Sequence, residues 1–245
     1  MAAERLDKLV SNRFCVPRKT AKSDIKAGLV KVNGEVVKIP ESKVEDSSAI
    51  SYGDREVRGS KYVYIMMNKP AGVLTASTDR SRTTVVDLVP TAVKRKGLFP
   101  VGRLDRDTTG LIIITDDGSW AHGIVSPKHH VEKRYIVTLD GEITENMKED
   151  FRRGVTLADG TVCRPALLDG TERPGVVTVT LREGKYHQIK RMFGVYGLGV
   201  NALHRDSIGD LSLDGSLAPG ESREMTLREV RLAAETQTGD NGEQE

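Results

Sequence analysis

Two helical stretches and a hairpin are predicted at the start of the chain. Residues 6–10 carry apolar side chains at helical spacing, and a second helical stretch runs between Pro17 and Gly28. Two β-prone segments follow within residues 29–39, on either side of Asn33-Gly34, the pair that best tolerates the positive φ angles of a tight turn. These elements predict a compact unit of roughly fifty residues with only a small core.

A different pattern begins near residue 60, where strands dominate. Residues 176–181 alternate valine or leucine with threonine, which is the period of a half-buried strand. Apolar stripes at helical spacing predict helices over 143–151 and 189–196, and Thr226 with Glu229 has the spacing of a capping box. Further strands are predicted over residues 62–67, 110–115 and 134–139. The chain is therefore expected to be α+β, with a mostly antiparallel, mixed sheet after a small helix-helix-hairpin domain.

Changes in composition divide the chain into four parts. The polar stretch 53–60 is expected to be a linker between a first domain, residues 1–52, and a second domain, residues 61–232. Residues 233–245 hold four acidic and no basic side chains, so we expect a disordered acidic tail.

The net charge of +2 hides an uneven distribution. Residues 1–38 hold nine basic and four acidic side chains, a net charge of +5. Such a basic end is the electrostatic footprint of a phosphate-binding surface. The charge alone fits a solvated helix face equally well.

The remaining composition indicates a cytoplasmic protein. The two cysteines, Cys15 and Cys163, lack the short spacing of a metal site, and the first residues lack the apolar core of a signal peptide. The longest strongly apolar run, near residues 111–114, is far too short to cross a bilayer. We therefore expect a reduced, cytoplasmic setting and no membrane partner.

Ionic and turn-forming residues gather directly before one predicted strand. Residues 102–110 read GRLDRDTTG, so Asp105 follows Arg103 by two positions and directly precedes Arg106. Neighbouring positive charges favour the ionised carboxylate, which can serve as a nucleophile or a base at neutral pH. A surface loop with ordinary ion pairs has the same composition, and the spacing alone does not decide between the two.

Four segments, in order, resemble the motifs of the ribosomal pseudouridine synthases of the RsuA and Rlu group. Residues 102–115 (GRLDRDTTGLIIIT) resemble the aspartate motif of that family and residues 68–73 (NKPAGV) its first motif. Residues 133–135 (KRY) resemble the tyrosine motif, and residues 183–192 (EGKYHQIKRM) resemble the third motif. The resemblance covers nearly the whole chain and implies a pseudouridine synthase catalytic domain over residues 61–232.

The first domain resembles the RNA-binding module of the ribosomal protein S-four type. The resemblance lies in residues 17–21 (PRKTA) and 28–34 (GLVKVNG), and it agrees with the basic charge of this region. It implies that residues 1–52 bind RNA through phosphates, a contact that gives affinity and register but little sequence information. The basic residues expected to contact phosphates are Arg5, Arg18, Lys19 and Lys22.

The resemblance also assigns roles in the catalytic site. Asp105 is expected to act on the ribose of a flipped-out uridine, as a nucleophile or as a base. Tyr135 is expected to stack on the flipped uracil, and Arg103 to stack where the base has left. Leu203 matches a family leucine that packs under the base, although an ordinary core leucine fits the same position.

A basic partner for the aspartate is expected at Lys190. Lys190 and Arg191 flank the apolar stripe of the helix predicted over 189–196, so either can reach inward. By resemblance we assign Lys190 to Asp105 and Arg191 to the RNA. Arg191 stays an alternative, because some relatives carry arginine at the partner position.

The reaction implied by the resemblance needs no cofactor. Pseudouridine formation breaks the glycosidic bond of uridine and rejoins the base through a carbon, with no net change of atoms or electrons. Neither a redox cofactor nor a metal is expected. His122, His129 and His130 lie close in sequence, but no acid or cysteine completes a four-ligand set, and residues 127–130 are typical of a basic loop that touches RNA.

Two features indicate the small-subunit branch of the family: Thr108-Thr109-Gly110 and residues 185–188. They indicate 16S ribosomal RNA as the substrate. A pre-ribosomal small-subunit particle is the expected partner, and a monomer is the expected state. A large-subunit (23S) synthase is the first alternative. A non-catalytic ribosome-assembly protein would be marked by loss of Asp105 or Tyr135, and both are present. A sugar hydrolase that pairs Asp105 with Asp107 leaves the basic module unexplained.

Overall fold

The computed structural model describes residues 3–45, 47–57, 62–126 and 131–234. The end of the expected linker (58–60), the loop at 127–130 with His129 and His130, and the acidic tail from residue 235 lie outside the described residues. The chain forms two compact units. The first comprises Met1–Tyr64, Val89–Phe99 and Thr115–Asp117, and the second comprises Ile65–Leu88, Pro100–Ile114 and Gly118–Glu245. No helix of the described residues is long and apolar enough to cross a membrane.

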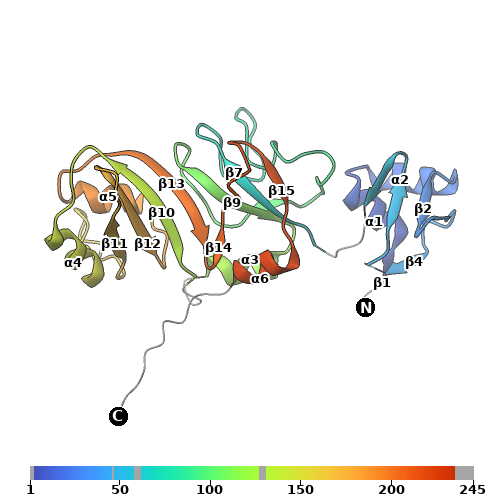
Figure 1. Ribbon diagram of the computed structural model, residues 1–245. Helices are drawn as coiled ribbons and strands as arrows, with labels where there is room; N and C mark the ends of the chain where they lie inside the picture. Colours follow the sequence, from blue (N-terminus) through green and yellow to red (C-terminus); the bar gives the residue numbers. More distant parts are fainter. Residues whose placement is uncertain (1–2, 46, 58–61, 127–130, 235–245) are drawn as a thin grey trace, which may run out of the picture. The chain divides into compact units, whose positions relative to one another are not determined.

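The first unit contains both predicted helices and the predicted hairpin (Figure 1). Asn33 and Gly34 have φ angles of 51° and 90°, as the tight turn requires. Two further strands extend the hairpin into an antiparallel sheet of order β3-β2-β5-β6, and β1 pairs with β4. The elements are β1 (Ala3–Arg5), α1 (Leu6–Arg13), α2 (Arg18–Lys26), β2 (Val30–Val32), β3 (Glu35–Val36), β4 (Lys43–Glu45), β5 (Ile50–Tyr52) and β6 (Arg55–Val57).

Residues 55–57, expected within the linker, instead form β6. Gly53, with a φ of 60°, allows the chain to turn back, so that Arg55 pairs with Tyr52. The glycine that suggested a linker therefore closes a hairpin.

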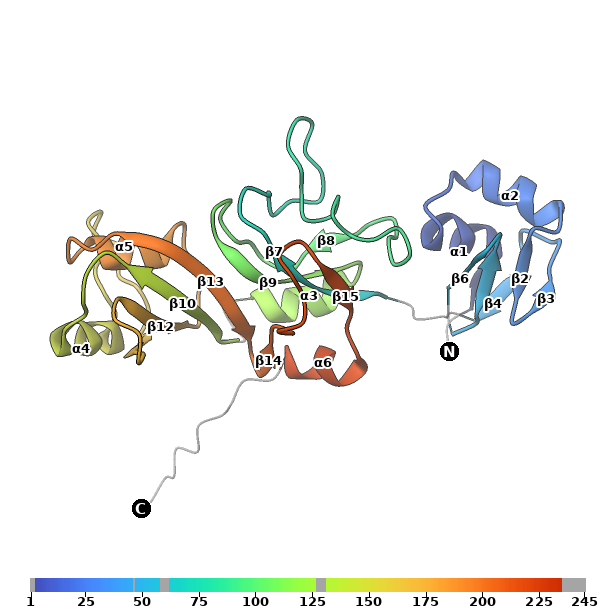
Figure 2. The ribbon, with the colours of Figure 1, turned by 45° about the horizontal axis from the view of Figure 1, so that its top comes forward.

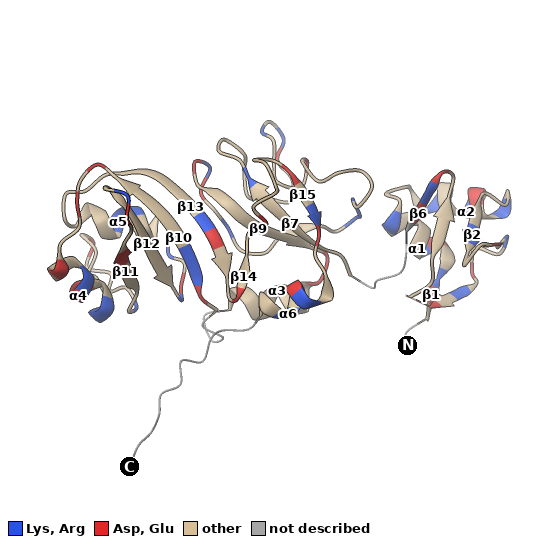
Figure 3. Cartoon of the chain, viewed as in Figure 1, with Lys and Arg blue, Asp and Glu red and all other residues tan. Residues whose placement is uncertain are grey.

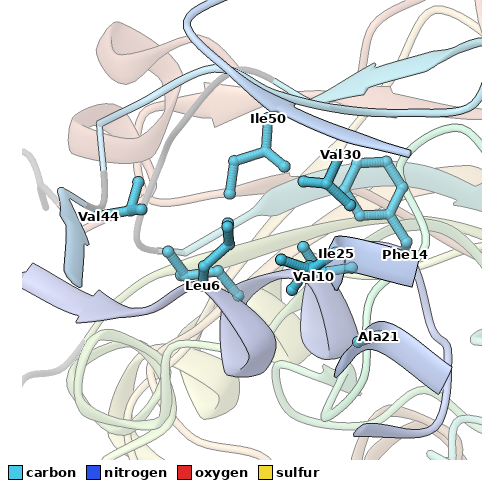
Figure 4. Packing of buried hydrophobic residues seen from close by; sticks show 9 residues of the cluster. Leu6, Val10, Phe14, Ala21, Ile25, Val30, Val44 and Ile50 are labelled. Carbon is cyan, nitrogen blue, oxygen red and sulfur yellow. The ribbon is translucent and has the colours of Figure 1, made fainter. Parts of the chain in front are cut away.

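An apolar cluster packs the two helices of the first unit against its strands (Figure 4). Leu6 and Val10 of α1 are fully buried, as are Ala21 and Ile25 of α2. Their spacing of four residues places each pair on one face of its helix, and both faces turn toward the sheet. Val30, Val44 and Ile50 of the strands complete the cluster.

The second unit is built on a nine-stranded sheet of order β11-β12-β10-β13-β9-β7-β15, in which β14 pairs with β13 and β8 with β9. Figures 1 and 2 show α3 and α6 beside the β9-β7-β15 part, and α4 and α5 beside the β10-β12-β11 part. The elements are β7 (Tyr64–Lys69), β8 (Phe99–Pro100), β9 (Thr109–Thr115), α3 (Gly118–Val125), β10 (Lys133–Leu139), α4 (Glu145–Arg153), β11 (Leu167–Gly170), β12 (Val176–Leu181), α5 (Gln188–Gly194), β13 (Val200–Ile208), β14 (Leu211–Ser212), β15 (Ser222–Glu224) and α6 (Leu227–Leu232).

The predicted α+β class with a mostly antiparallel, mixed sheet is confirmed. Strand β10 is antiparallel to β12 and β13, whereas β13 is parallel to β9. The predicted capping box is also confirmed, because the Thr226 hydroxyl and the Glu229 side chain form it at the start of α6. In α5, Ile189, Met192 and Phe193 are buried.

The parallel contact of β13 with β9, here called the junction, joins the two parts of the sheet. It consists of two Cα pairs, His204 with Thr109 and Arg205 with Gly110. Gly110 has a φ of 100°, and a Cβ atom there would lie 2.2 Å from the carbonyl oxygen of Arg205. Only glycine therefore fits at this point of the junction. The buried Arg205 donates from Nε to the Leu111 carbonyl at 2.8 Å, which ties β13 to β9 a second time.

Candidate active site

Asp105 lies on the loop between β8 and β9, and a buried lysine anchors this loop. Lys69, at the end of β7, donates from Nζ to the carbonyl oxygens of Arg106 (3.2 Å), Thr108 (2.9 Å) and Pro70 (3.0 Å). Its side chain is fully buried. Burial lowers the pKa of Lys69 to about 8, while the nearby Asp107 and Asp105 charges oppose this shift. The ammonium therefore fixes the backbone directly after Asp105.

The backbone directly before Asp105 is held by Thr75. The Thr75 hydroxyl donates to the Leu104 carbonyl at 2.8 Å and accepts from the Leu104 amide at 3.2 Å. The Gly72 amide also donates to the Arg106 carbonyl at 2.8 Å. With its backbone fixed on both sides, Asp105 is presented from a rigid loop.

Four predicted residues meet at one cavity. Its volume is about 350 Å³, and its walls include Asp105, Arg103, Tyr135 and Leu203. Tyr135 on β10 and Leu203 on β13 are buried and come from neighbouring strands, with Leu203 opposite Val137. Asp105 comes from the other side of the junction. The cavity thus combines a carboxylate, an apolar wall and an aromatic ring.

The two candidate basic partners lie in different places. Lys190 Nζ is 3.9 Å from Asp105 Oδ2, but it is closer to Asp107, at 2.7 and 2.6 Å from the two carboxylate oxygens. The hydrogen bond from Lys190 lowers the pKa of Asp107. Arg191 instead forms an ion pair with Asp159 and donates to the Tyr186 carbonyl. Of the two candidates, Lys190 therefore lies beside Asp105, and it divides its charge between two carboxylates.

A histidine that the sequence analysis passed over also reaches Asp105. His187 Nε2 lies 3.6 Å from Asp105 Oδ1. The residue precedes α5 in a left-handed conformation, with φ 47° and ψ 37°, which few non-glycine residues adopt. Its place in the KYHQ stretch was the only signal in the sequence.

The cavity also contains a buried hydroxyl group that lacks a partner. Thr108 is 1% exposed, and its Oγ1 makes no hydrogen bond to any described residue. Buried hydroxyls nearly always have a partner. Thr108 also lines the cavity, but this hydroxyl lies beneath the accessible surface.

Three of the four predicted phosphate contacts of the first unit lie around one carboxylate. Asp7 is fully buried, and its oxygens lie 3.0 Å from Arg5, 3.0 Å from Arg18 and 3.7 Å from Lys22. The hydrogen bond from Arg5 holds the pKa of Asp7 well below its usual range. Lys19 is exposed on α2. Figure 3 marks the basic and acidic positions of this unit.

Among the described residues, no cluster of three or more His, Cys, Asp or Glu side chains could hold a metal ion. His129 and His130, which lie close to His122 in sequence, fall outside the described residues.

Comparisons with known proteins identify the family of this chain. The RNA pseudouridylate synthase model matches residues 63–194, and the S4 domain model matches residues 4–50. The "Ribosomal small subunit pseudouridine synthase A" of Escherichia coli is 40% identical over 228 residues, 92% of this chain and 98% of the relative. An "Uncharacterized RNA pseudouridine synthase" of Bacillus subtilis is 41% identical over 95% of this chain and 99% of the relative. A solved "pseudouridylate synthase" superposes with a TM-score of 0.66 at 38% identity, covering 94% of this chain and 99% of that one.

The chain belongs to the RNA pseudouridylate synthase family. It is a pseudouridine synthase, an isomerase, with an N-terminal S4 domain. The sugar-hydrolase and non-catalytic interpretations are thereby excluded.

Proposed function

We propose that this enzyme converts one uridine of 16S ribosomal RNA to pseudouridine, with Asp105 acting on the ribose of the flipped-out nucleotide. The observation that carries the proposal is the anchored Asp105 at the cavity shared with Tyr135 and Leu203. The small-subunit assignment rests on the 40% identity with the "Ribosomal small subunit pseudouridine synthase A" proteins of Escherichia coli and Yersinia pestis. The enzyme acts as a monomer on a pre-ribosomal small-subunit particle in the cytoplasm.

The cavity suits a uracil that has left its stack. A base inside folded RNA must be extruded before its glycosidic bond can be reached. The Tyr135 ring and the Leu203 side chain supply an apolar surface for the extruded uracil. Arg103 lies at the same cavity, and its planar guanidinium stacks where the base has left.

The reaction exchanges one bond to the ribose for another. The C1′–N1 bond breaks, the base turns, and a C1′–C5 bond forms while the C5 proton is lost and N1 gains one. The Asp105 carboxylate attacks or deprotonates the sugar as the first bond breaks. Lys190 Nζ and His187 Nε2 lie 3.9 and 3.6 Å from its carboxylate oxygens.

A map of pseudouridines tests the function. Ribosomal RNA from cells with and without this protein is compared, and the purified enzyme is added to a 16S transcript. We expect one 16S position to depend on the protein, and the Asp105→Asn variant not to restore it. If a pseudouridine of 23S ribosomal RNA disappears instead, the substrate is the large-subunit RNA. An unchanged map together with an unmodified transcript would refute the proposed function.

The S4 domain is proposed to hold the RNA by its phosphates. Arg18 and Lys22 are about half exposed beside Asp7, and Lys19 is exposed nearby on α2. Each phosphate that a basic residue neutralises contributes close to one unit to the slope of log affinity against log salt on duplex RNA, and less on single strands. Replacing Arg18, Lys19 and Lys22 by glutamine should therefore flatten the slope. An unchanged slope would mean that these residues do not contact phosphate.

A further inference from the structure

Tyr186 presents an unusually exposed aromatic ring beside the active site. Its side chain is 76% exposed, more than that of any other large apolar residue among those described. One face of the ring stacks on His187, with centroids 3.8 Å apart and planes inclined by 17°. An exposed aromatic ring next to a functional cavity is a common mark of a binding surface.

The Tyr186–His187 stack is held in place before any ligand arrives. The buried Gln188 accepts from the Lys185 amide at 2.9 Å and donates to Glu183 at 2.7 Å, which closes the loop that carries the two rings. Arg191 donates to the Tyr186 carbonyl at 3.4 Å. A ring that is already oriented loses little conformational entropy on binding, so the stack is preorganised.

The position of the stack indicates what it binds. Tyr186 and His187 line the same cavity as Asp105 and Tyr135, and His187 Nε2 lies 3.6 Å from Asp105 Oδ1. When a uridine occupies the cavity, its chain neighbours must leave along the rim. A planar, uncharged ring at that rim has the chemistry to receive a nucleobase, because every base offers a π-face.

We propose that Tyr186 binds, by stacking, the base of a nucleotide directly adjacent to the target uridine. This subsite rests on the proposed function of the cavity beside it. His187 backs the tyrosine ring, and the neighbouring base forms the third member of the stack. The contact sets the register of the RNA at the cavity. It does not select among bases, since stacking on an aromatic ring tolerates all four.

The test removes each partner of the proposed stack in turn. The probe is a synthetic 16S fragment centred on the uridine found by the pseudouridine map, intact or with an abasic residue directly 5′ or 3′ of it. Dissociation constants are measured for wild type, Tyr186→Phe and Tyr186→Ala. On intact RNA we expect Tyr186→Ala to weaken binding about ten-fold and Tyr186→Phe to stay within about two-fold. One of the two abasic fragments lacks the base that stacks on Tyr186. On that fragment, wild type and Tyr186→Ala should bind equally.

The control is Leu227→Ala, which removes a 73% exposed apolar side chain at the start of α6 and should bind every fragment like wild type. Unchanged binding by Tyr186→Ala on intact RNA, or the same loss on both abasic fragments, would overturn the subsite. If no uridine is modified, the proposed function is refuted, but the stacking subsite can still be tested. Wild type and Tyr186→Ala are then compared on nine-nucleotide oligouridylate, intact and with each base omitted in turn. Equal binding of the two proteins to the intact oligonucleotide, or the same loss for every abasic one, would overturn the subsite.

Discussion

Two aspartates of this protein sit among basic side chains, and they differ in how fully they are satisfied. Asp7 in the first unit is fully buried, and Arg5 and Arg18 donate to its two oxygens at 3.0 to 3.1 Å. Asp105 in the second unit is 30% exposed, and its basic neighbours His187 and Lys190 stay at 3.6 and 3.9 Å. Both have positive neighbours, but only Asp7 is bound by them.

We interpret the difference as that between a structural carboxylate and the proposed catalytic one. The lone pairs of Asp7 are engaged by guanidinium groups, so the carboxylate orders the basic cluster and has little capacity for other chemistry. Asp105 lines a cavity, and Lys190 is closer to Asp107, at 2.6 Å, than to Asp105. Both carboxylates have basic neighbours, so the distinction among the described residues is whether these neighbours donate hydrogen bonds to the carboxylate.

The largest expected effect comes from exchanging each carboxylate for an amide. Asp105→Asn should lower the single-turnover rate at saturating enzyme by at least about 100-fold, since a positioned nucleophile or base commonly contributes that much. Asp7→Asn is the matched control and should keep the wild-type rate per folded molecule. Turnover by Asp105→Asn above about one hundredth of wild type would remove the catalytic distinction between the two aspartates.

Lys69 offers a test by pH of the loop that presents Asp105. Its pKa is about 8 in the folded protein against an ordinary 10.5, so between these values the unfolded chain holds a proton that the folded chain has lost. The free energy of unfolding should therefore rise with pH in this window. Relative to Lys69→Met, wild type should gain about 2 kcal/mol between pH 7.5 and 9.5, measured by urea unfolding. Parallel curves for the two proteins would show that the Lys69 amine is not buried as described.

Lys190 tests whether a cation that is shared with Asp107 still supports Asp105. Lys190→Met should lower the single-turnover rate at saturating enzyme about ten-fold, because a positive charge 3.9 Å from the Asp105 carboxylate is lost. Lys190→Arg should keep much of the activity. Arg191→Met, the adjacent control, should act on RNA affinity alone. A slower single-turnover rate in Arg191→Met but not in Lys190→Met would assign the partner to Arg191.

The smallest effect is expected in the stability of the first unit. Asp7→Asn should lower the free energy of unfolding by about 1 kcal/mol at pH 7, a modest value because Arg5, Arg18 and Lys22 remain solvated. The pKa of Asp7 is depressed, so its contribution is complete above the ordinary value of 3.8 and shrinks as the pH falls below it. Thermal unfolding at pH 7 and pH 3 measures the difference. If Asp7→Asn lowers the free energy of unfolding equally at pH 7 and pH 3, the loss comes from packing and not from the charge of Asp7.

Local patterns predicted much of the fold because they depend on neighbours in sequence. The Asn33-Gly34 turn and the Thr226–Glu229 capping box are set within a few residues, and both are present as expected. Strand β13 was missed because His204, Arg205 and Asp206 interrupt its apolar pattern. Arg205 is buried there, and its Nε donates to the Leu111 carbonyl, a contact across 94 residues that the sequence does not reveal.

The candidate site divides in the same way. The resemblance predicted Asp105, Tyr135 and Leu203 as site residues, and the three line one cavity. The attachment of Lys190 to Asp107 depends on the fold of a loop 83 residues away. Lys69 lies within the first motif, residues 68–73, but its three carbonyl partners come together only once the loop is folded around it.

The junction at Gly110 makes the active site an internal interface within one sheet. Asp105 belongs to the part of the sheet that carries β9, whereas Tyr135 and Lys190 belong to the part that carries β10 and α5. Between them, backbone approaches backbone so closely that a methyl group would lie 2.2 Å from the Arg205 carbonyl. We expect a larger residue at position 110 to push the two parts of the sheet apart at the junction while each part stays folded. Gly110 therefore keeps Asp105 aligned with Tyr135 and Lys190, although it contributes no group to the site itself.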